Sequence, residues 1–313
     1  MHIIIPEDYQ DCVRKLDCFT KLQPHEVTVY NDSCKDPEEL VRRFATADAL
    51  VLTRERTVLT EAMLRQLPRL KLISQIGKVA GHIDLDACRR LGIAVAQGSG
   101  SGAATAELTW ALMLASRRHI VSESNRLRQG LWQGSLGQKL QGHRLGIWSY
   151  GRIGEQVARY GRAFGMHVWV WGRSGSTDKA RADGFEVAPS RDDFFAQSDI
   201  VSLHIRLNEQ TQGIIKKADL ARMGPHALIV NTSRAELIEP GALQHALAAG
   251  APGFAAVDVY EEEPAITSPL LAMPNVLCTP HLGYVERDNY ESYFATAFDN
   301  INQFFLGEPT NLV

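Results

Sequence analysis

Three short segments of this sequence carry side chains that could bind a small acid and move a proton on it. Arg234 lies in VNTSRAE, Glu263 in DVYEEEP and His281 in TPHLG. A guanidinium can hold a carboxylate through two parallel hydrogen bonds. An imidazole gives and takes a proton near neutral pH, and a neighbouring carboxylate favours its protonated form. Each residue taken singly also fits an ordinary surface position, so the argument depends on whether the fold brings them together.

Each of these segments follows an apolar run that we expect to form a strand. The runs are Leu228–Val230, Phe254–Val257 and Val276–Cys278. In an open parallel α/β sheet, ligands bind outside the carboxyl ends of the strands. We therefore place the three segments at the edge of a sheet where a ligand site is expected.

A strand–turn–helix–strand pattern spans residues 145–174. Apolar runs at Leu145–Trp148 and Val168–Trp171 flank a segment with apolar residues at helical spacing. This is the size and order of a βαβ unit whose turn can hold a pyrophosphate at a helix N-terminus.

The turn of this unit departs from the G-x-G-x-x-G pattern. Ser149 stands at the first glycine position, while Gly151 and Gly154 keep the other two. Serine is small enough for the turn, but a positive φ angle there would cost energy. The turn alone fits nucleotide binding and an ordinary α/β turn equally well.

The end of the second strand bears on the choice of nucleotide. NAD-binding units usually place an Asp or Glu there to bind the ribose 2′-hydroxyl. Here Gly172 is followed by Arg173 and Ser174, with Ser176 and Thr177 nearby. No carboxylate would repel a 2′-phosphate, and a guanidinium with several hydroxyls could hold one. The pattern favours NADP, and a solvated surface turn is the alternative interpretation.

Strands and helices alternate over the rest of the chain, which predicts parallel sheets wrapped by helices. Further strands are expected at Ile3–Ile5, Val27–Tyr30, Ala49–Leu52, Leu72–Ile76, Ile93–Val95, Phe185–Val187 and Ile200–Ile205. Further helices are expected at Asp8–Phe19, Pro37–Thr46, Thr60–Gln66, Leu85–Leu91, Arg191–Ala196, Lys216–Arg222, Glu239–Ala249 and Glu286–Phe305.

The segment Gln97–Gly102 (QGSGSG) has the composition of a linker. A long helical pattern follows from about Ala103 to Gln129, which could cross between domains or pack on a partner subunit. Arg117, Arg118, Arg126 and Arg128 are expected on its solvated face.

Length and composition bound the class of protein. The 313 residues allow two domains, and 45% hydrophobic with 22% charged residues is typical of a globular protein. With Lys+Arg 33 against Asp+Glu 36, the net charge of −3 does not point to nucleic acid. The five cysteines form no C-x-x-C and no zinc-like spacing, so no metal site is expected.

The sequence shows neither a signal peptide nor a membrane helix, so we expect a soluble, cytoplasmic protein. The N-terminal apolar run breaks at Pro6, too early for a signal peptide, and no segment approaches the ~18 apolar residues of a membrane helix. The chain ends at Val313, soon after the last expected helix, so we expect no regulatory domain behind it.

From Leu52 onward the sequence resembles the D-isomer-specific 2-hydroxyacid dehydrogenases, the family of phosphoglycerate dehydrogenase and glyoxylate/hydroxypyruvate reductase. Seven segments have the order and spacing seen in that family: GKVAGHID (77–84), TAE (105–107), YGRIG (150–154), LHIRL (203–207), NTSR (231–234), DVYEEEP (258–264) and PHLG (280–283).

The resemblance implies roles for the matched positions. Arg234 would bind the carboxylate and carbonyl of the substrate, His281 would be the general acid and base, and Glu263 would orient His281. Backbone amides around Lys78 and Val79 would take the other side of the carboxylate. The expected cofactor-binding set is Thr105, Tyr150, Gly151, Arg152, Ile153, Gly172, Arg173, Ser174, His204, Arg206, Thr211, Thr232, Asp258 and Gly283. Within this set, residues 150–153 would cover the pyrophosphate and Asp258 would meet the carboxamide.

The resemblance also implies an α/β fold of two doubly wound parallel-sheet (Rossmann-like) domains. A dinucleotide-binding domain (98–286) would be inserted into a substrate domain (1–97 plus 287–313). A homodimer through the cofactor domains is implied as well.

Several positions depart from the family pattern. Ser149 replaces a glycine, Ala235 stands where glycine is common, and Gly172-Arg173 replaces the acidic residue, as in the NADPH-using reductases. Arg206 replaces a usual proline and could be a second basic group near the adenosine. Lys78 could select a second negative group on the substrate, or point to solvent.

The sequence therefore predicts an oxidoreductase that prefers NADP(H), with NAD(H) as the alternative, and acts on a small 2-oxo or D-2-hydroxy acid. Reduction of the 2-oxo acid is the expected direction of the reaction. We expect no nucleic-acid or membrane partner. Two other hypotheses stay open: a nucleotide-sensing, corepressor-like protein of the same fold, and a family member acting on another small anion such as formate or phosphite.

Overall fold

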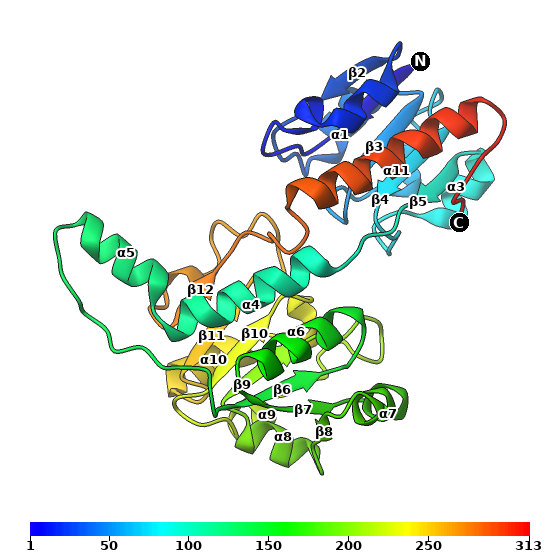
Figure 1. Ribbon diagram of the computed structural model, residues 1–313. Helices are drawn as coiled ribbons and strands as arrows, with labels where there is room; N and C mark the ends of the chain where they lie inside the picture. The colour runs from blue at the N-terminus through cyan, green and yellow to red at the C-terminus, as the bar shows by residue number, and fades with distance from the viewer. The chain divides into compact units, whose positions relative to one another are not determined.

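The computed structural model describes residues 1–313, which divide into two compact units (Figure 1). Unit 1 comprises Met1–Ser101 and Glu286–Val313, and unit 2 comprises Gly102–Val285. Each unit is built on one parallel sheet, of five strands in unit 1 and seven in unit 2. The predicted α/β class with two parallel-sheet domains is thus confirmed. The assignment of substrate to one unit and cofactor to the other stays a prediction.

The sheet of unit 1 has the order β2-β1-β3-β4-β5. Its strands are β1 (His2–Ile5), β2 (Glu26–Val29), β3 (Ala49–Thr53), β4 (Leu72–Ile76) and β5 (Ala94–Gln97). Strands β3 and β4 are buried along their whole length, as expected for parallel strands covered on both faces.

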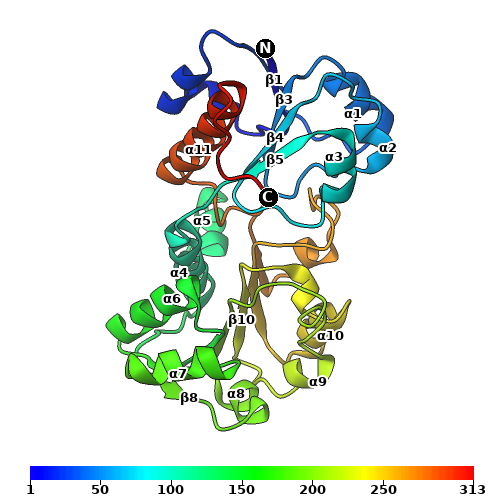
Figure 2. The ribbon, with the colours of Figure 1, turned by 90° about the vertical axis from the view of Figure 1, so that its right-hand side faces the viewer.

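Helices cover both faces of this sheet (Figure 2). The short helices α1 (Pro37–Phe44), α2 (Glu61–Leu64) and α3 (Leu85–Leu91) share one apolar core with β3 and β4. The long helix α11 (Arg287–Phe305) contacts β4 and the 3-10 helix η2 (Asp17–Leu22), and η1 (Val13–Lys15) precedes η2.

The expected helix at Asp8–Phe19 is wrong, because this segment forms the turns of η1 and η2 instead. The carboxylate of Asp8 accepts hydrogen bonds from the amides of Cys12 (3.1 Å) and Val13 (2.9 Å). A side chain that satisfies backbone donors in this way stabilises a turn in place of a regular helix.

The sheet of unit 2 has the order β12-β11-β10-β9-β6-β7-β8. Its strands are β6 (Arg144–Trp148), β7 (His167–Trp171), β8 (Glu186–Val187), β9 (Ile200–Leu203), β10 (Leu228–Asn231), β11 (Phe254–Val257) and β12 (Val276–Cys278). Strands β6 and β9 are neighbours although β7 and β8 lie between them in the sequence. This reversal of strand order is where open α/β sheets form their ligand crevice.

Two apolar cores lie on the two faces of the unit 2 sheet. Helices α4 (Ala103–Arg117), α6 (Arg152–Ala163) and α7 (Ser174–Ala182) pack on one face. Helices α8 (Arg191–Gln197), α9 (Lys217–Leu220) and α10 (Ala242–Ala249) pack on the other, and the 3-10 helices η3 (Ala235–Leu237) and η4 (Pro269–Ala272) follow β10 and β11. Helix α7 was not predicted, because its glycine and small polar residues favour a turn by local propensity.

The expected single helix from Ala103 to Gln129 is wrong. Helix α4 ends at Arg117 and a separate helix α5 (Ile120–Arg128) follows, because His119 adopts a left-handed conformation (φ 53°) that a continuous helix cannot contain.

Arg117 is buried and does not belong to a solvated face. Its guanidinium donates to the backbone oxygens of His226 (2.7 Å) and Asp199 (2.5 Å) and to the side chain of Gln138 (2.9 Å). Burial lowers its pKa to about 10. No helix of the chain has the length and apolar character needed to span a membrane.

Candidate active site

His281 and Glu263 form a hydrogen-bonded pair in the loops that follow β12 and β11. Nδ1 of His281 lies 2.7 Å from Oε2 of Glu263, and the side chains are 20% and 33% exposed. The other carboxylate oxygen accepts from the Tyr260 amide at 3.1 Å. The imidazole is therefore held through Nδ1, which leaves Nε2 for a reacting atom.

The pKa of Glu263 is lowered from its ordinary value. Burial acts against ionisation, but the hydrogen bond and charge of His281, the Tyr260 amide and the positive charge of Arg234 together outweigh it. Glu263 is thus a carboxylate at neutral pH. An ionised partner both orients an imidazole and stabilises its protonated form.

Asp258 holds the loop that carries His281. Its buried carboxylate accepts from the Thr279 hydroxyl (2.6 Å) and from the amides of Leu282 (2.7 Å) and Gly283 (2.8 Å). Within this loop His281 has a φ of 52°, in the left-handed region. The contact of Asp258 with a nicotinamide carboxamide stays a prediction, and the observed bonds give this carboxylate a structural role first.

Arg234 lies in the turn after β10, at the same edge of the sheet. The carbonyl of Arg234 accepts from the Asn231 side chain (2.9 Å), and the Ser233 hydroxyl donates to the Leu203 carbonyl (2.7 Å). Its guanidinium donates to the Ser233 carbonyl at 2.7 Å and lies near enough to Glu263 to lower that pKa. Arg234 thus lies at the same edge of the sheet as the His281–Glu263 pair, and its positive charge contributes to the lowered pKa of Glu263.

The turn after β6 has the close packing of a phosphate-binding turn. Ser149 adopts a φ of 78°, the conformation for which glycine is expected. A Cβ atom at Gly154 would lie 2.3 Å from the Ser149 carbonyl oxygen, so only glycine fits there. Gly151 is the N-cap of α6, and a Cβ added to Gly151 would meet nothing within 4 Å. The turn therefore leaves open space in front of a helix N-terminus.

Tyr150 and Ser176 tie this turn to helix α7. The Tyr150 amide donates to the Ser176 hydroxyl, and the buried Tyr150 ring donates its hydroxyl to Asp183 at 2.8 Å. Burial, with the charge of Asp183, raises the pKa of Tyr150. Residues 150–153 were expected to cover a pyrophosphate, and no pattern in the sequence marks Ser176 as the acceptor of the Tyr150 amide.

Among the other expected cofactor residues, Arg173 and Ser174 are exposed at the start of α7, with Arg173 as its N-cap. His204 follows β9 and bonds the Ser202 hydroxyl at 3.0 Å, and burial lowers its pKa to about 3. Arg206 is exposed in the next loop.

The remaining expected cofactor residues hold loops of unit 2 in place. Thr211 donates its hydroxyl to the carbonyl of Arg206 at 2.7 Å and so closes the loop after β9. Thr105 donates to the carbonyl of Gly283 at 2.7 Å, and Thr232 is bonded to Thr109 at 2.7 Å. Arg152 and Ile153 are the first two residues of helix α6. Gly172 directly follows strand β7.

The substrate residues expected in unit 1 follow strand β4. Lys78 is exposed, and the Val79 amide donates to the side chain of Gln97 at 3.2 Å. A Cβ at Gly77 would lie 2.6 Å from the Arg54 guanidinium, so this arginine lies over the loop. Neither Gln97 nor Arg54 was singled out from sequence, because no local pattern marks a residue that acts on a loop from another strand.

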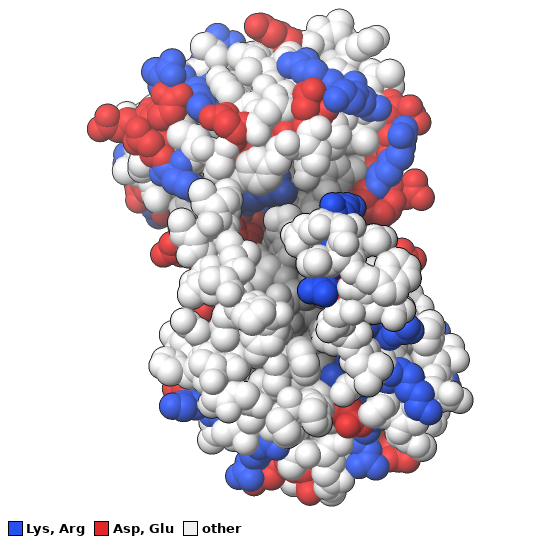
Figure 3. Space-filling view, turned by 90° about the vertical axis from the view of Figure 1, so that its left-hand side faces the viewer, with Lys and Arg blue, Asp and Glu red and all other residues white.

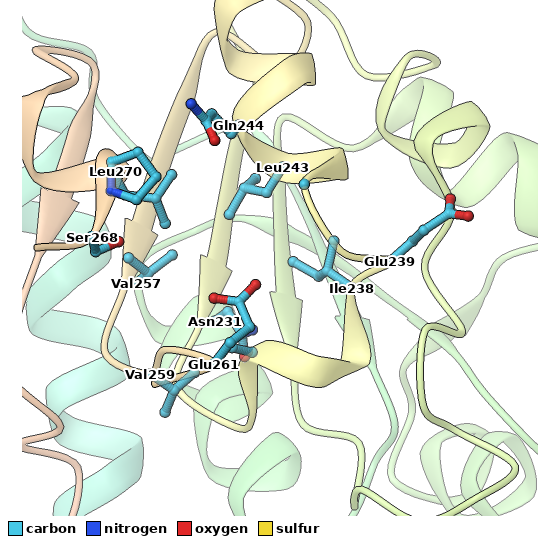
Figure 4. A pocket seen from close by; sticks show the side chains of 13 residues that line it. Asn231, Ile238, Glu239, Leu243, Gln244, Val257, Val259, Glu261, Ser268 and Leu270 are labelled. Atoms are coloured by element: carbon cyan, nitrogen blue, oxygen red, sulfur yellow. The ribbon is translucent and has the colours of Figure 1, made fainter. Parts of the chain in front are cut away.

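A cavity of about 120 Å³ lies on the α10 side of the unit 2 sheet. Side chains from the ends of β10 and β11, from α10 and from η4 line it (Figure 4). The lining includes Asn231 and Glu261 but none of the predicted catalytic residues. No group of three or more His, Cys, Asp or Glu side chains is arranged to hold a metal ion.

A parallel sheet with a glycine turn at its switch point is typical of dinucleotide-binding folds, and here a His–Glu pair lies at the carboxyl edge of the same sheet. Residues 110–283 match the family model described as D-isomer specific 2-hydroxyacid dehydrogenase, NAD binding domain. The chain is also 36% identical over 306 residues to a glyoxylate reductase of Aeropyrum pernix, covering 92% of this chain and 90% of that protein. The chain therefore belongs to the D-isomer specific 2-hydroxyacid dehydrogenase family.

Two further relatives support this assignment. A crystal structure of a phosphoglycerate oxidoreductase from Vibrio cholerae shares 51% identity with a TM-score of 0.96, covering 98% of this chain and 99% of that one. The D-3-phosphoglycerate dehydrogenase of Methanocaldococcus jannaschii is 34% identical over 274 residues. That match covers 87% of this chain but only 52% of the M. jannaschii protein.

Replacement of Ser149 by glycine should stabilise the protein. The left-handed conformation costs a non-glycine residue about 1–2 kcal/mol, and glycine removes this cost. The greater backbone freedom of glycine in the unfolded chain lowers the free energy of unfolding and so cancels part of this stabilisation. We expect a net increase of about 0.5–1 kcal/mol in the free energy of unfolding, measured by urea denaturation. Ser149→Ala is the matched control, since alanine keeps the strained φ. Equal stability of the two variants would show that backbone strain at this position is negligible.

Proposed function

We propose that this protein transfers a hydride between NADP(H) and C2 of a small 2-oxo or D-2-hydroxy acid, with His281 as the acid and base. The observation that carries the proposal is the His281–Glu263 pair, at 2.7 Å, with Arg234 near it. Membership of the family supports the class of reaction. The substrate, the proton donor and the preference for NADP(H) are proposals.

The residues of unit 2 fit a dinucleotide. The turn after β6 leads into the N-terminus of the twelve-residue helix α6, and Gly154 has no room for a Cβ. Backbone amides in the first turn of a helix lack intrahelical acceptors and attract phosphate. Residues 150–153 would hold the pyrophosphate, and Thr232, His204 and Asp258 would line the nicotinamide end. When bound, the nicotinamide supplies or accepts the hydride.

The side chains of the site would then act on the substrate. Arg234 would hold the carboxylate and polarise the carbonyl through its guanidinium. His281 would give a proton from Nε2 to the carbonyl oxygen during reduction and take it back during oxidation. Glu263 would keep the imidazole oriented through Nδ1, and its negative charge would balance the imidazolium.

The first test is turnover of glyoxylate and hydroxypyruvate with NADPH and with NADH, followed by the His281→Gln variant. Glutamine keeps a polar side chain but cannot exchange a proton, so kcat should fall by at least about 100-fold. The dissociation constant of NADPH should change little. Near-normal turnover in this variant would contradict the acid–base role, and wild-type cofactor binding without turnover of any 2-oxo acid would favour a sensor protein.

The surroundings of Arg173 support NADP(H) over NAD(H). Arg173 is the exposed N-cap of the nine-residue helix α7, next to Ser174, and no carboxylate stands at Gly172. A helix N-terminus and a guanidinium both attract phosphate dianions. We propose that they bind the 2′-phosphate, with Arg206 as a second cation.

Arg173→Ala should therefore weaken the binding of NADPH more than that of NADH. Loss of a charge-assisted hydrogen bond costs about 1–3 kcal/mol, or roughly 5- to 150-fold in the dissociation constant. Fluorescence titration with both cofactors measures this. Arg181→Ala is the matched control, because Arg181 is an exposed arginine at the other end of α7, paired with Asp178. An equal loss for both cofactors would remove the proposed 2′-phosphate contact.

An exposed apolar segment supports the proposed homodimer. This apolar arm comprises α5 and the segment after it, with Leu127 58%, Trp132 74% and Leu136 95% exposed. Figure 3, seen from the side on which α5 lies in Figure 1, shows a broad surface of unit 2 without charged side chains. Large apolar side chains exposed together in this way mark protein–protein interfaces. We propose that the arm packs on a second copy through the cofactor domains.

The state of the cysteines supports a cytoplasmic location. All five cysteines are free thiols, which suits the reducing cytoplasm.

Charge placed on the apolar arm should dissociate the dimer. Trp132→Glu should shift the protein toward monomer in sedimentation velocity, because a buried unpaired carboxylate is costly at an interface. Ile266→Glu is the control, since Ile266 is 84% exposed but lies outside the arm. A wild-type protein that sediments as a monomer at micromolar concentration would overturn the assembly proposal.

A further inference from the structure

One face of helix α4 is bonded to two of the three loops that carry the proposed catalytic side chains, those of His281 and Arg234. Thr105 and Thr109 are one helical turn apart, so their side chains lie on the same face. The Thr105 hydroxyl donates to the carbonyl of Gly283, two residues after His281, at 2.7 Å. The Thr109 hydroxyl lies 2.7 Å from the hydroxyl of Thr232, two residues before Arg234.

The direction of these hydrogen bonds follows from the number of protons available. A hydroxyl has one proton to donate and two lone pairs to accept with. The Thr109 hydroxyl uses its proton in the hydrogen bond that it donates to the carbonyl of Thr105, at 2.7 Å. In the contact between the two hydroxyls, Thr232 must therefore be the donor and Thr109 the acceptor. The Thr105 hydroxyl uses its one proton in the same way, in the hydrogen bond that it donates to the Gly283 carbonyl.

The packing around these bonds is close. Thr109 is fully buried and Thr232 is 8% exposed. A Cβ at Gly283 would lie 3.2 Å from the Asp258 carboxylate and 3.3 Å from the Thr105 methyl group. The loop that carries His281 thus packs against both the buried carboxylate of Asp258 and helix α4.

From this geometry we infer that Thr105 and Thr109 are positioning residues for the reaction. Thr105 holds the His281 loop through Gly283, and Thr109 holds the Arg234 loop through Thr232. The inference rests on the proposed function and assigns Thr105 a different primary role from that of a cofactor ligand. With their protons committed, the Thr105 and Thr232 hydroxyls can accept hydrogen bonds from a ligand but cannot donate to one.

The test replaces each hydroxyl by a methyl group of similar size. We expect Thr105→Val and Thr109→Val each to lower kcat about tenfold, because small misplacements of catalytic groups reduce rates strongly. The dissociation constant of NADPH should stay within about twofold, as expected when an interaction acts on chemistry and not on binding. Thr105→Ser and Thr109→Ser keep the hydroxyl and should restore most of the activity.

Hydrogen-exchange mass spectrometry gives a readout that does not depend on turnover. Thr105→Val should speed exchange in residues 279–285, and Thr109→Val should speed it in residues 231–236. Thr296→Val is the matched control, because the Thr296 hydroxyl makes the same kind of bond to a carbonyl one turn back, that of Ser292, at 2.9 Å in α11. It should change neither kcat nor exchange in these loops.

The outcomes separate the inference from the function on which it rests. An inactive wild type would refute the proposed function, while the exchange experiment would still decide whether the threonines hold the loops. An active wild type with unchanged kcat and exchange in both valine variants would overturn the inference. A weaker affinity for NADPH with normal kcat would instead make Thr105 a cofactor ligand. If Thr109→Val does not fold, the partly exposed Thr105 carries the test through its valine and serine variants.

Discussion

The buried carboxylate of Asp258 is the constraint on which the candidate site depends. It holds a loop whose His281 has a left-handed backbone, a conformation that costs about 1–2 kcal/mol for a side chain of this kind. Hydrogen bonds to a charged group contribute about 1.5–3 kcal/mol each, and this carboxylate accepts three. These bonds offset both the backbone strain and part of the desolvation of the carboxylate. They fix the backbone on either side of His281, and Glu263 then fixes the imidazole through Nδ1.

The sheet supplies the large-scale arrangement that these hydrogen bonds refine. Strands β10, β11 and β12 are adjacent and parallel, with Asn231 paired to Val257 and Val257 to Cys278. The loops after these strands therefore leave the sheet at the same edge. Parallel pairing places the ends of neighbouring strands roughly 5 Å apart. Side-chain bonds such as that of Glu263 to the Tyr260 amide then fix the final geometry.

Sequence reasoning was most reliable where the signal is periodic or local. The buried strands and the fold class followed from runs of apolar residues, and the loops of the candidate site followed from the ends of those runs. It failed where a single residue decides the backbone. His119 breaks the expected long helix, and Asp8 converts an expected helix into turns, because one conformation or one side-chain acceptor overrides the pattern around it.

Contacts between distant segments were also beyond local patterns. Ser176 accepts a hydrogen bond from the turn after β6. Thr105 and Thr109 of helix α4 together join two loops that are separated by about fifty residues, as counted between Thr232 and Gly283. Such contacts depend on register and helix packing, which the sequence of one segment does not contain. The family resemblance could name Thr105 and Thr232 but could not give the direction of their hydrogen bonds.

Two of the three non-glycine residues of unit 2 with a positive φ lie where the proposed chemistry needs fixed groups, and the third, His119, separates α4 from α5. Ser149 and His281 both have positive φ angles, one in the turn expected to hold phosphate and the other in the loop expected to hold the acid. Strained residues persist only when their surroundings determine their conformation. For His281 these surroundings are Asp258 and helix α4. For Ser149 they are the hydrogen bond that its backbone amide donates to the Trp171 carbonyl at 2.8 Å and the close approach of Gly154. A fold that has already met these costs can present its side chains without rearrangement, which is the condition for stabilising charge that develops during a reaction.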